Sequence, residues 1–172
     1  MKIAEDLRAK RDLYAQHGGS RSLLRAALAD GTLANALYRL QALLARNGLG
    51  PVAWAVHLLN KWINGCVIGV HAEFGPGLVL IHPIGVVINS SVVAGRRIAI
   101  ESGVVIGDNH GRSPVLEDDI FIGSGAKIIG NVRVGSGARV GANAVVLRDV
   151  DPGSTVVGIP ARAVRSGQDR PT

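Results

Sequence analysis

A six-residue hydrophobic repeat over residues 68–146 constrains the fold of this chain more than any other feature. When every sixth residue is read, thirteen of fourteen positions are large and apolar, whereas a composition that is 47% hydrophobic would fill only about half of them by chance. The apolar positions are Ile68, Phe74, Leu80, Val86, Val92, Ile98, Val104, Leu116, Ile122, Ile128, Val134, Val140 and Val146. A period of six fits neither an amphipathic helix nor a hairpin sheet. It is the period of a parallel β-helix, in which each flat face of a coil takes one hexapeptide.

The one polar position in this series is His110, which lies in the polar stretch 107–114. Because Val104 and Leu116 on either side stay in phase, we predict a polar loop that protrudes from one corner as the single break in the repeat. In later units such as 122–127, the first residue is expected to point inward and the fifth is small or β-branched. Gly and Asn stand near the corners, where they adopt backbone angles that other residues avoid.

The chain divides into an α-helical N-terminal region over residues 1–65, a β-helix over 66–164 and a flexible tail over 165–172. Residues 1–17 predict a modestly amphipathic helix with Glu5, Asp6 and Lys10 on its exposed face. A solenoid end exposes unpaired strand edges, so we expect the helices to cap one end of the β-helix.

Two further helices are predicted in the N-terminal region. Leucines recur at helical spacing over residues 23–47, with Ser20 as the expected N-cap and an interruption around Asp30 and Gly31. The third helix, over 51–62, is apolar nearly all round. Such a helix must be buried, either on the end of the β-helix or against a neighbouring subunit.

Composition narrows the possible functions. The net charge of +6 is scattered along the chain without interleaved aromatics, so it favours a small anionic ligand such as a phosphorylated cofactor over nucleic acid. The one cysteine, Cys66, excludes an internal disulfide and is expected to be a small buried hydrophobe. No signal peptide is recognisable, and the apolar stretch 49–59 is too short to span a bilayer, so a cytoplasmic protein is expected.

Three segments resemble the hexapeptide-repeat acyltransferases, and most closely the serine O-acetyltransferase group. They are 77–88 (GLVLIHPIGVVI), 122–131 (IGSGAKIIGN) and 157–162 (VGIPAR). The hexapeptides alone are shared by many transferases and some inactive homologues, whereas the histidine segment is more specific. The resemblance implies a left-handed β-helix, although parallel crossovers are generally right-handed. It also implies a homotrimer with active sites in the grooves between subunits and acetyl-CoA laid along the coils; larger members pair trimers into hexamers through a longer helical region.

The resemblance places the general base of the reaction at His82. A hydroxyl must lose its proton as it attacks a thioester, and imidazole is suited to accept it. The other interpretation is a structural histidine bonded to nearby backbone. A second histidine of the family aligns with Ser113, and His110, three residues earlier, could reach across the subunit boundary instead or be an ordinary exposed loop residue.

Two carboxylates of the family are missing from their places. The aspartate that orients the base aligns with Gly69, and the aspartate directly before the histidine aligns with Ile81. The candidate substitutes are Glu73, Glu101 and Asp108, each of which is also typical of a solvated surface charge.

The coenzyme positions of the family transfer to Ser124, Gly125, Arg139, Ala142 and Arg162. Ser124 and Ala142 align with small residues whose backbone amides face the pantetheine arm, and Gly125 keeps that surface open. Such amides could also hold the thioester oxygen as it becomes negative. Arg139 and Arg162 align with basic residues near the phosphates of the coenzyme. The alternative interpretation is that both are ordinary surface charges.

These observations favour an acetyl-CoA-dependent O-acetyltransferase that needs no metal and forms no acyl-enzyme. L-serine is the acceptor that the resemblance implies. Because an ammonium group needs an acidic partner, the missing carboxylates keep open an alternative acceptor: a sugar, a glycan precursor or a modified amino acid. A different class of function is an inactive β-helix that binds a partner through its helical cap. A third hypothesis, nucleic-acid binding, is supported only by the net positive charge.

Overall fold

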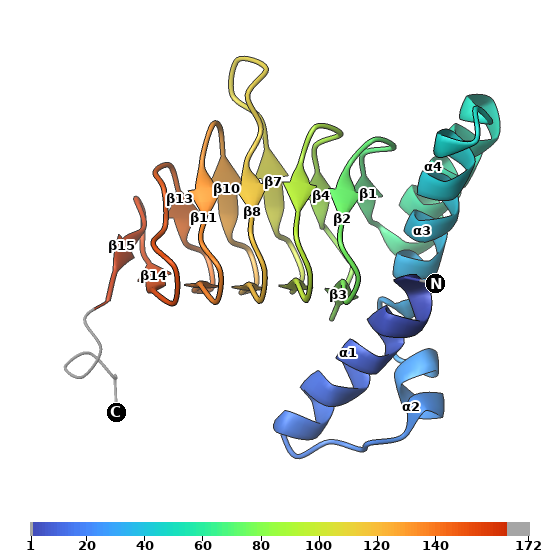
Figure 1. Ribbon diagram of the computed structural model, residues 1–172, viewed down its shortest axis with the longest axis horizontal. Coiled ribbons are helices and arrows are strands. Elements are labelled where there is room, and N and C mark those ends of the chain that lie inside the picture. Colours follow the sequence, from blue (N-terminus) through green and yellow to red (C-terminus); the bar gives the residue numbers. More distant parts are fainter. Residues whose placement is uncertain (1, 165–172) are drawn as a thin grey trace.

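The computed structural model describes residues 2–164, in which four helices precede a solenoid of fifteen short strands (Figure 1). The predicted tail, 165–172, lies outside the described residues. The helices are α1 (Lys2–Gln16), α2 (Leu23–Leu28), α3 (Thr32–Arg46) and α4 (Gly50–Asn64). The strands are β1 (Val67–Ile68), β2 (Glu73–Phe74), β3 (Val79–Leu80), β4 (Val87–Ile88), β5 (Val93–Ala94), β6 (Ala99–Ile100), β7 (Val105–Gly107), β8 (Val115–Leu116), β9 (Phe121–Ile122), β10 (Lys127–Ile129), β11 (Arg133–Val134), β12 (Arg139–Val140), β13 (Val145–Val146), β14 (Thr155–Val157) and β15 (Arg162–Ala163).

Successive strands fall into three sheets, so that the chain winds as a β-helix. Their orders are β1-β4-β7-β10-β13, β2-β5-β8-β11 and β3-β6-β9-β12-β14-β15, and only β14 and β15 pair antiparallel in the described part of the chain. The coil is left-handed, as the family resemblance implied. The general preference for right-handed crossovers does not hold here, because it arises from strand twist and strands of two or three residues impose little twist.

The predicted hydrophobic series lines the interior of the solenoid. All thirteen apolar positions are buried, and His110 is exposed. The small fifth residues Ala126, Val132, Ala138 and Ala144 are buried as well. Each face of the coil therefore buries a stacked apolar row, which stabilises the fold at roughly 25 cal/mol per Å² of apolar surface without a large aromatic core.

The strands are spaced less regularly than the sequence period. Leu80 is followed by the next inward strand residue, Ile88, after eight positions, and Ile106 is followed by Leu116 after ten. The two insertions, of two and four residues, together make one hexapeptide, so the six-residue series returns to phase beyond them. The prediction of a single break was therefore wrong. A second insertion lies within residues 81–86, at the corner that carries His82.

The helices cover one end of the solenoid, as predicted (Figure 1). Polar side chains of α3 donate hydrogen bonds to the backbone of the first coil. The Tyr38 hydroxyl bonds the carbonyl of residue 72 at 2.9 Å, the Gln41 amide bonds that of residue 68 at 2.8 Å, and the Asn35 amide bonds that of residue 78 at 2.9 Å. These bonds satisfy backbone groups that are left unpaired at the exposed edge of the first coil.

Asp6 and Lys10 of α1 are buried, although the sequence predicted an exposed face. One Asp6 carboxylate oxygen accepts hydrogen bonds from the N–H groups of Gly77 at 2.8 Å and Leu78 at 2.9 Å. The Lys10 ammonium donates to the carbonyl of Leu80 at 3.1 Å. An amphipathic helix normally packs with apolar residues, but this one packs on backbone donors and acceptors, which require polar partners.

The second predicted helix is two helices. A turn at residues 29–31 separates α2 from α3, and Gly31 has a φ of 78° in the left-handed region. Ser22, rather than Ser20, caps α2, because its hydroxyl accepts from the N–H of Arg25 at 3.4 Å. The weak interruption in the leucine pattern thus marks a change of direction in the chain.

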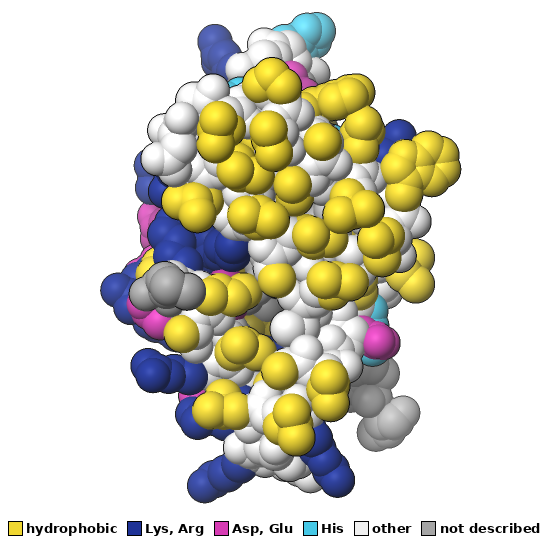
Figure 2. Space-filling model, turned by 90° about the vertical axis from the view of Figure 1, so that its right-hand side faces the viewer, with side chains coloured by type: hydrophobic (Ala, Val, Ile, Leu, Met, Phe, Trp, Pro, Cys, Tyr) yellow, Lys and Arg dark blue, Asp and Glu magenta, His cyan; other side chains and the backbone are white. Residues whose placement is uncertain are grey.

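The apolar helix α4 is only partly buried in the single chain. Pro51 lies in its first turn as expected, and Ala53 and Asn60 are buried, but Trp54 is 59% exposed and Trp62 is 80% exposed. Figure 2 looks onto the helical end and shows hydrophobic side chains gathered over it. Within residues 2–164, no helix is long and apolar enough to cross a membrane.

Candidate active site

His82 lies in a corner of the solenoid that is longer than its counterparts. Six residues, 81–86, separate β3 from β4, whereas four residues separate β6 from β7, β9 from β10 and β12 from β13. The His82 side chain is 59% exposed at this corner. An enlarged, exposed turn on a rigid scaffold is typical of a functional position, because packing alone does not require it.

Asp30 brings a carboxylate to His82. Its Oδ2 atom is 3.4 Å from Nδ1 of the imidazole, and the two residues come from the α2–α3 turn and from the first coil. No sequence pattern predicts this pair, since the interruption at Asp30 indicated only a break in a helix. A carboxylate at Nδ1 leaves Nε2 as the nitrogen available to a substrate.

The three substitute carboxylates considered from the sequence do not pair with His82. Glu73 is on β2, in the four-stranded sheet rather than the six-stranded one. Asp108 accepts a hydrogen bond from the N–H of Gly111 at 3.1 Å inside the protruding loop. Glu101 follows β6 on the neighbouring coil, where its carboxylate accepts from the Ser124 N–H at 3.0 Å and from the Ser124 hydroxyl.

The corners that follow β3, β6, β9 and β12 are stacked along one edge of the solenoid. Backbone hydrogen bonds join each corner to the next: Gly103 N–H to Ile84 at 3.0 Å, Gly125 N–H to Ser102 at 2.8 Å and Asn143 N–H to Ser124 at 2.8 Å. We call this stack, residues 81–86, 101–104, 123–126 and 141–144, the corner column. His82 lies in its first corner, Ser124 and Gly125 in its third and Ala142 in its fourth.

Arg139 and Arg162 lie on the six-stranded sheet beside this column. Arg139 is on β12, and its guanidinium carbon is 4.8 Å from the ring centre of Phe121 on β9. Arg162 is exposed on β15, at the far end of the sheet from β3. Both cations are therefore toward the C-terminal coils, and His82 is next to the helical cap.

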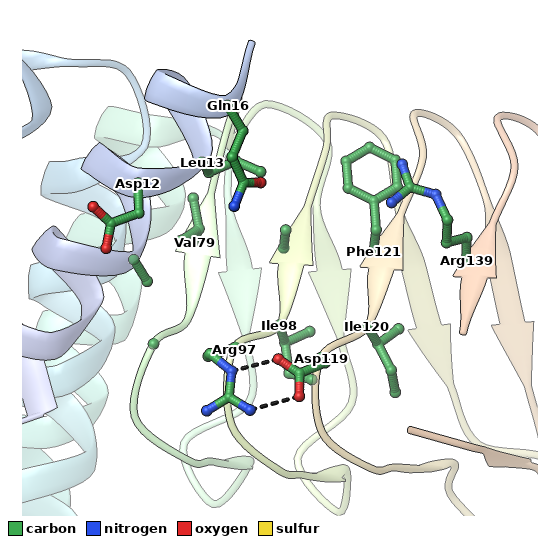
Figure 3. Close-up of a pocket in the computed structure, with 13 residues that line it drawn as sticks. Asp12, Leu13, Gln16, Val79, Arg97, Ile98, Asp119, Ile120, Phe121 and Arg139 are labelled. Atoms are coloured by element: carbon green, nitrogen blue, oxygen red, sulfur yellow. Dashed lines mark hydrogen bonds and ion pairs between the residues drawn. The ribbon is translucent and has the colours of Figure 1, made fainter. Parts of the chain in front are cut away.

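A hollow of about 370 Å³ lies over the outer face of the same sheet (Figure 3). Residues of α1 line one side of it, with the Arg97–Asp119 ion pair and the stacked Phe121 and Arg139 along the coils. Hydrogen bonds from Arg97 lower the pKa of Asp119 and raise the pKa of Arg97. His82 does not line this hollow.

His110 is separate from the other predicted site residues. It is exposed in the loop between β7 and β8, with a φ of 51°, and this loop projects at the top of Figure 1, whereas β3 lies at the bottom. Ser113, in the same loop, donates to the Asn89 side chain at 3.3 Å. A single chain therefore does not bring His110 to His82.

The potential metal ligands of the described residues are scattered, and their one cysteine is buried. Within 2–164, no group of three or more His, Cys, Asp or Glu side chains could hold a metal ion. Burial raises the pKa of the Cys66 thiol to about 12, as expected for a small buried hydrophobe. A thiol in that state is inert as a nucleophile near neutral pH.

Comparison with known proteins agrees with this architecture. Residues 113–148 match a family model described as bacterial transferase hexapeptide (six repeats). The serine acetyltransferase of Helicobacter pylori (strain J99) is 37% identical over 131 residues, which are 74% of this chain and 77% of that protein. The serine acetyltransferase of Synechococcus elongatus is 40% identical over 114 residues, which are 63% of this chain and 47% of that protein.

Solved structures show the same relationship. Soybean serine acetyltransferase in complex with serine superposes with a TM-score of 0.85 at 35% identity, covering 94% of this chain and 68% of that one. A serine acetyltransferase in complex with CoA superposes with a TM-score of 0.88 at 29% identity, covering 95% and 68%. This chain spans only about half the length of several curated relatives, at 47%, 54% and 48% of the first three. The shared repeat, helical cap and sequence identity establish that the chain belongs to the serine acetyltransferase family.

Proposed function

We propose that this chain transfers the acetyl group of acetyl-CoA to the hydroxyl of L-serine, with His82 as the general base. The observation that carries the proposal is an exposed histidine at the first corner of the column that also holds Ser124, Gly125 and Ala142. Related structures bound to serine and to CoA support this pair of substrates.

The proposed reaction uses one proton acceptor, His82, and no nucleophile from the protein, so the acetyl group passes directly to serine. The serine oxygen attacks the carbonyl carbon of the thioester while its proton passes to Nε2 of His82. The tetrahedral intermediate then collapses, the carbon–sulfur bond breaks, and the departing CoA sulfur takes the proton from His82. The products are O-acetylserine and CoA, and the histidine returns to its starting state.

The coenzyme is proposed to lie along the corner column. Its pantetheine arm would pass Ser124, Gly125 and Ala142, and its phosphates would lie near Arg139 and Arg162, where positive charge favours an anion. In the free chain the Ser124 N–H donates to Glu101. Coenzyme binding at that amide would therefore displace the Glu101 carboxylate.

We infer that the active assembly is a homotrimer. His110 and His82 lie at different corners of one chain, so they can share a site only if the 107–114 loop of one subunit reaches the corner column of another. The exposed apolar surface of α4 supports contact with further protein in such an assembly.

Release of the CoA thiol, followed with a thiol-reactive dye, tests the proposal. With acetyl-CoA and L-serine, His82→Ala should lower kcat by about 10²- to 10⁴-fold, the usual contribution of a general base. His71→Ala is the matched control, because His71 is also exposed on the first coil and lies outside the corner column. An equally active His82→Ala variant would exclude His82 as the base.

Acceptor identity is tested with the same assay on a panel of hydroxyl compounds. A sugar, glycan precursor or modified amino acid is the second candidate, because residues 69 and 81 are Gly and Ile rather than carboxylates. Turnover with one of these and none with serine would replace the proposed acceptor. An absence of acetyl transfer to every acceptor would favour an inactive scaffold that binds through the helical cap.

A further inference from the structure

The turn that carries Asp30 is tied to the strand that precedes His82. The buried Lys10 ammonium donates to the carbonyl of Asp30, to the Thr32 hydroxyl at 3.0 Å and to the carbonyl of Leu80 at 3.1 Å. Burial lowers the pKa of Lys10 to about 8, which is consistent with an ammonium removed from water between two backbone segments. One side chain thus fixes the distance between the α2–α3 turn and β3.

Gly31 allows the turn to approach β3 closely. Its φ of 78° is in the left-handed region, and a Cβ atom added there would lie 2.1 Å from the carbonyl oxygen of Leu80. The Thr32 hydroxyl closes the turn by donating to the carbonyl of Ala26 at 2.7 Å. A larger residue at position 31 would push the turn away from the strand, and the carboxylate of Asp30 with it.

From this arrangement we propose that Asp30 is the positioning residue of His82 and that the helical region supplies the orienting carboxylate. The inference rests on the proposed function, in which His82 is the base. A carboxylate at Nδ1 favours the tautomer that carries its proton on Nδ1, and so leaves the Nε2 lone pair for the acceptor hydroxyl. The corresponding coil position is Gly69, which has no side chain that could do this.

The pair contributes to orientation rather than to stability. The side chains of His82 and Asp30 are 59% and 76% exposed, and an exposed ion pair stabilises a fold little. The backbone of the turn, in contrast, is held by the buried contacts of Lys10 and Gly31. Asp30 can therefore be changed without unfolding the protein, and docking of the helices becomes a condition for catalysis.

The test compares Asp30→Asn with Asp30→Glu and with the control Asp151→Asn in the full chain. Asp151 is exposed in a turn of the last coil, away from the helices. Asp30→Asn should lower kcat by about 10- to 100-fold, the typical effect of losing a residue that orients a histidine, with KM for both substrates nearly unchanged. Asp30→Glu should recover part of kcat, and Asp151→Asn should match the parent chain. Urea midpoints should agree among the four proteins.

A second readout does not depend on activity. Long-range ¹H–¹⁵N NMR of the His82 ring, assigned by its loss in His82→Gln, should show the Nδ1–H tautomer in the parent chain and a mixture of tautomers in Asp30→Asn. Unchanged tautomers and kcat would overturn the inference. A higher KM for serine with kcat unchanged would also overturn it, because Asp30 would then hold the acceptor.

The two proposals fail in different ways. An active parent chain whose kcat and His82 tautomer are indifferent to Asp30 refutes the positioning role and leaves the proposed function standing. A parent chain inactive with every acceptor, but with a tautomer that depends on Asp30, refutes the proposed function and retains the coupling between the two side chains.

Discussion

The interior of the solenoid and the interface between the helices and the first coil are both buried, but different forces hold them together. The interior buries thirteen apolar residues of one repeating series. The interface instead buries Asp6, Lys10, Asn35 and Gln41 against backbone groups of the first coil. Apolar burial is non-directional and tolerates repetition, whereas a strand edge needs particular donors and acceptors at particular places.

The comparison predicts that the interface is more sensitive to a single substitution than the interior. Asp6 accepts hydrogen bonds from two backbone N–H groups and pairs with Arg39 at 2.8 Å and 2.9 Å. Arg39 also donates to the carbonyls of Phe74 at 2.8 Å and Gly75 at 2.7 Å. Loss of Asp6 would leave the N–H groups of Gly77 and Leu78 without their acceptor and the Arg39 guanidinium without its counter-charge.

The largest effect is expected for Asp6→Ala. Breaking a buried ion pair by removing one partner costs about 3–5 kcal/mol, because an uncompensated charge stays buried. The free energy of unfolding in urea measures this loss. Asp12→Ala, an exposed change on the same helix, should alter stability by no more than about 0.5 kcal/mol. A loss below about 1 kcal/mol for Asp6→Ala would mean that the cap interface is not held by this network.

A smaller effect is expected in the interior, from Ile128→Val. Ile128 is fully buried, and removal of one buried methylene typically costs about 0.5–1.5 kcal/mol. Val87→Ala serves as the control, because Val87 is 42% exposed on the outside of the coil. The free energy of unfolding in urea, measured for both variants, is compared with that of Asp6→Ala. A cost for Ile128→Val equal to that of Asp6→Ala would contradict the difference between the regions.

The smallest effect is expected at the exposed Arg97–Asp119 pair on the coil surface. A double-mutant cycle with Arg97→Ala and Asp119→Ala should give a coupling energy of about 0–1 kcal/mol, reduced by added salt. Hydrogen bonds from Arg97 lower the pKa of Asp119, so the stabilisation is present above the unfolded value of 3.8 and disappears as pH falls through the lower folded pKa. Urea midpoints at pH 7 and pH 3 measure this change, and Arg97→Ala should lack the Asp119 contribution at both.

Only part of the candidate site could be predicted from the sequence. The repeat correctly predicted which residues are buried, but it concealed the longer corner at 81–86, because two insertions together equal one hexapeptide. His82 could be chosen by resemblance to a family motif. Asp30 could not, because the leucine pattern around it indicated only a helix break and no local pattern pairs it with His82.

The capping residues were missed for a related physical reason. In sequence, Asp6 and Lys10 have the spacing of a solvated helix face, and no local property distinguishes a charge that meets water from one that meets a strand edge. The partner that decides between them is contributed by residues 77–80, far along the chain.

The sequence by itself determined that this chain forms a parallel β-helix with a helical cap. The six-residue apolar period and the helical spacing of leucines are local patterns, which can be recognised without knowing which distant segments make contact. The tertiary structure decided which polar groups meet. It brought Asp30 to His82 through the docking of the α2–α3 turn on β3, and it buried Asp6 and Lys10 on the strand edge. Hydrogen bonds and ion pairs are directional and short-ranged, so their partners are set only when distant segments have packed.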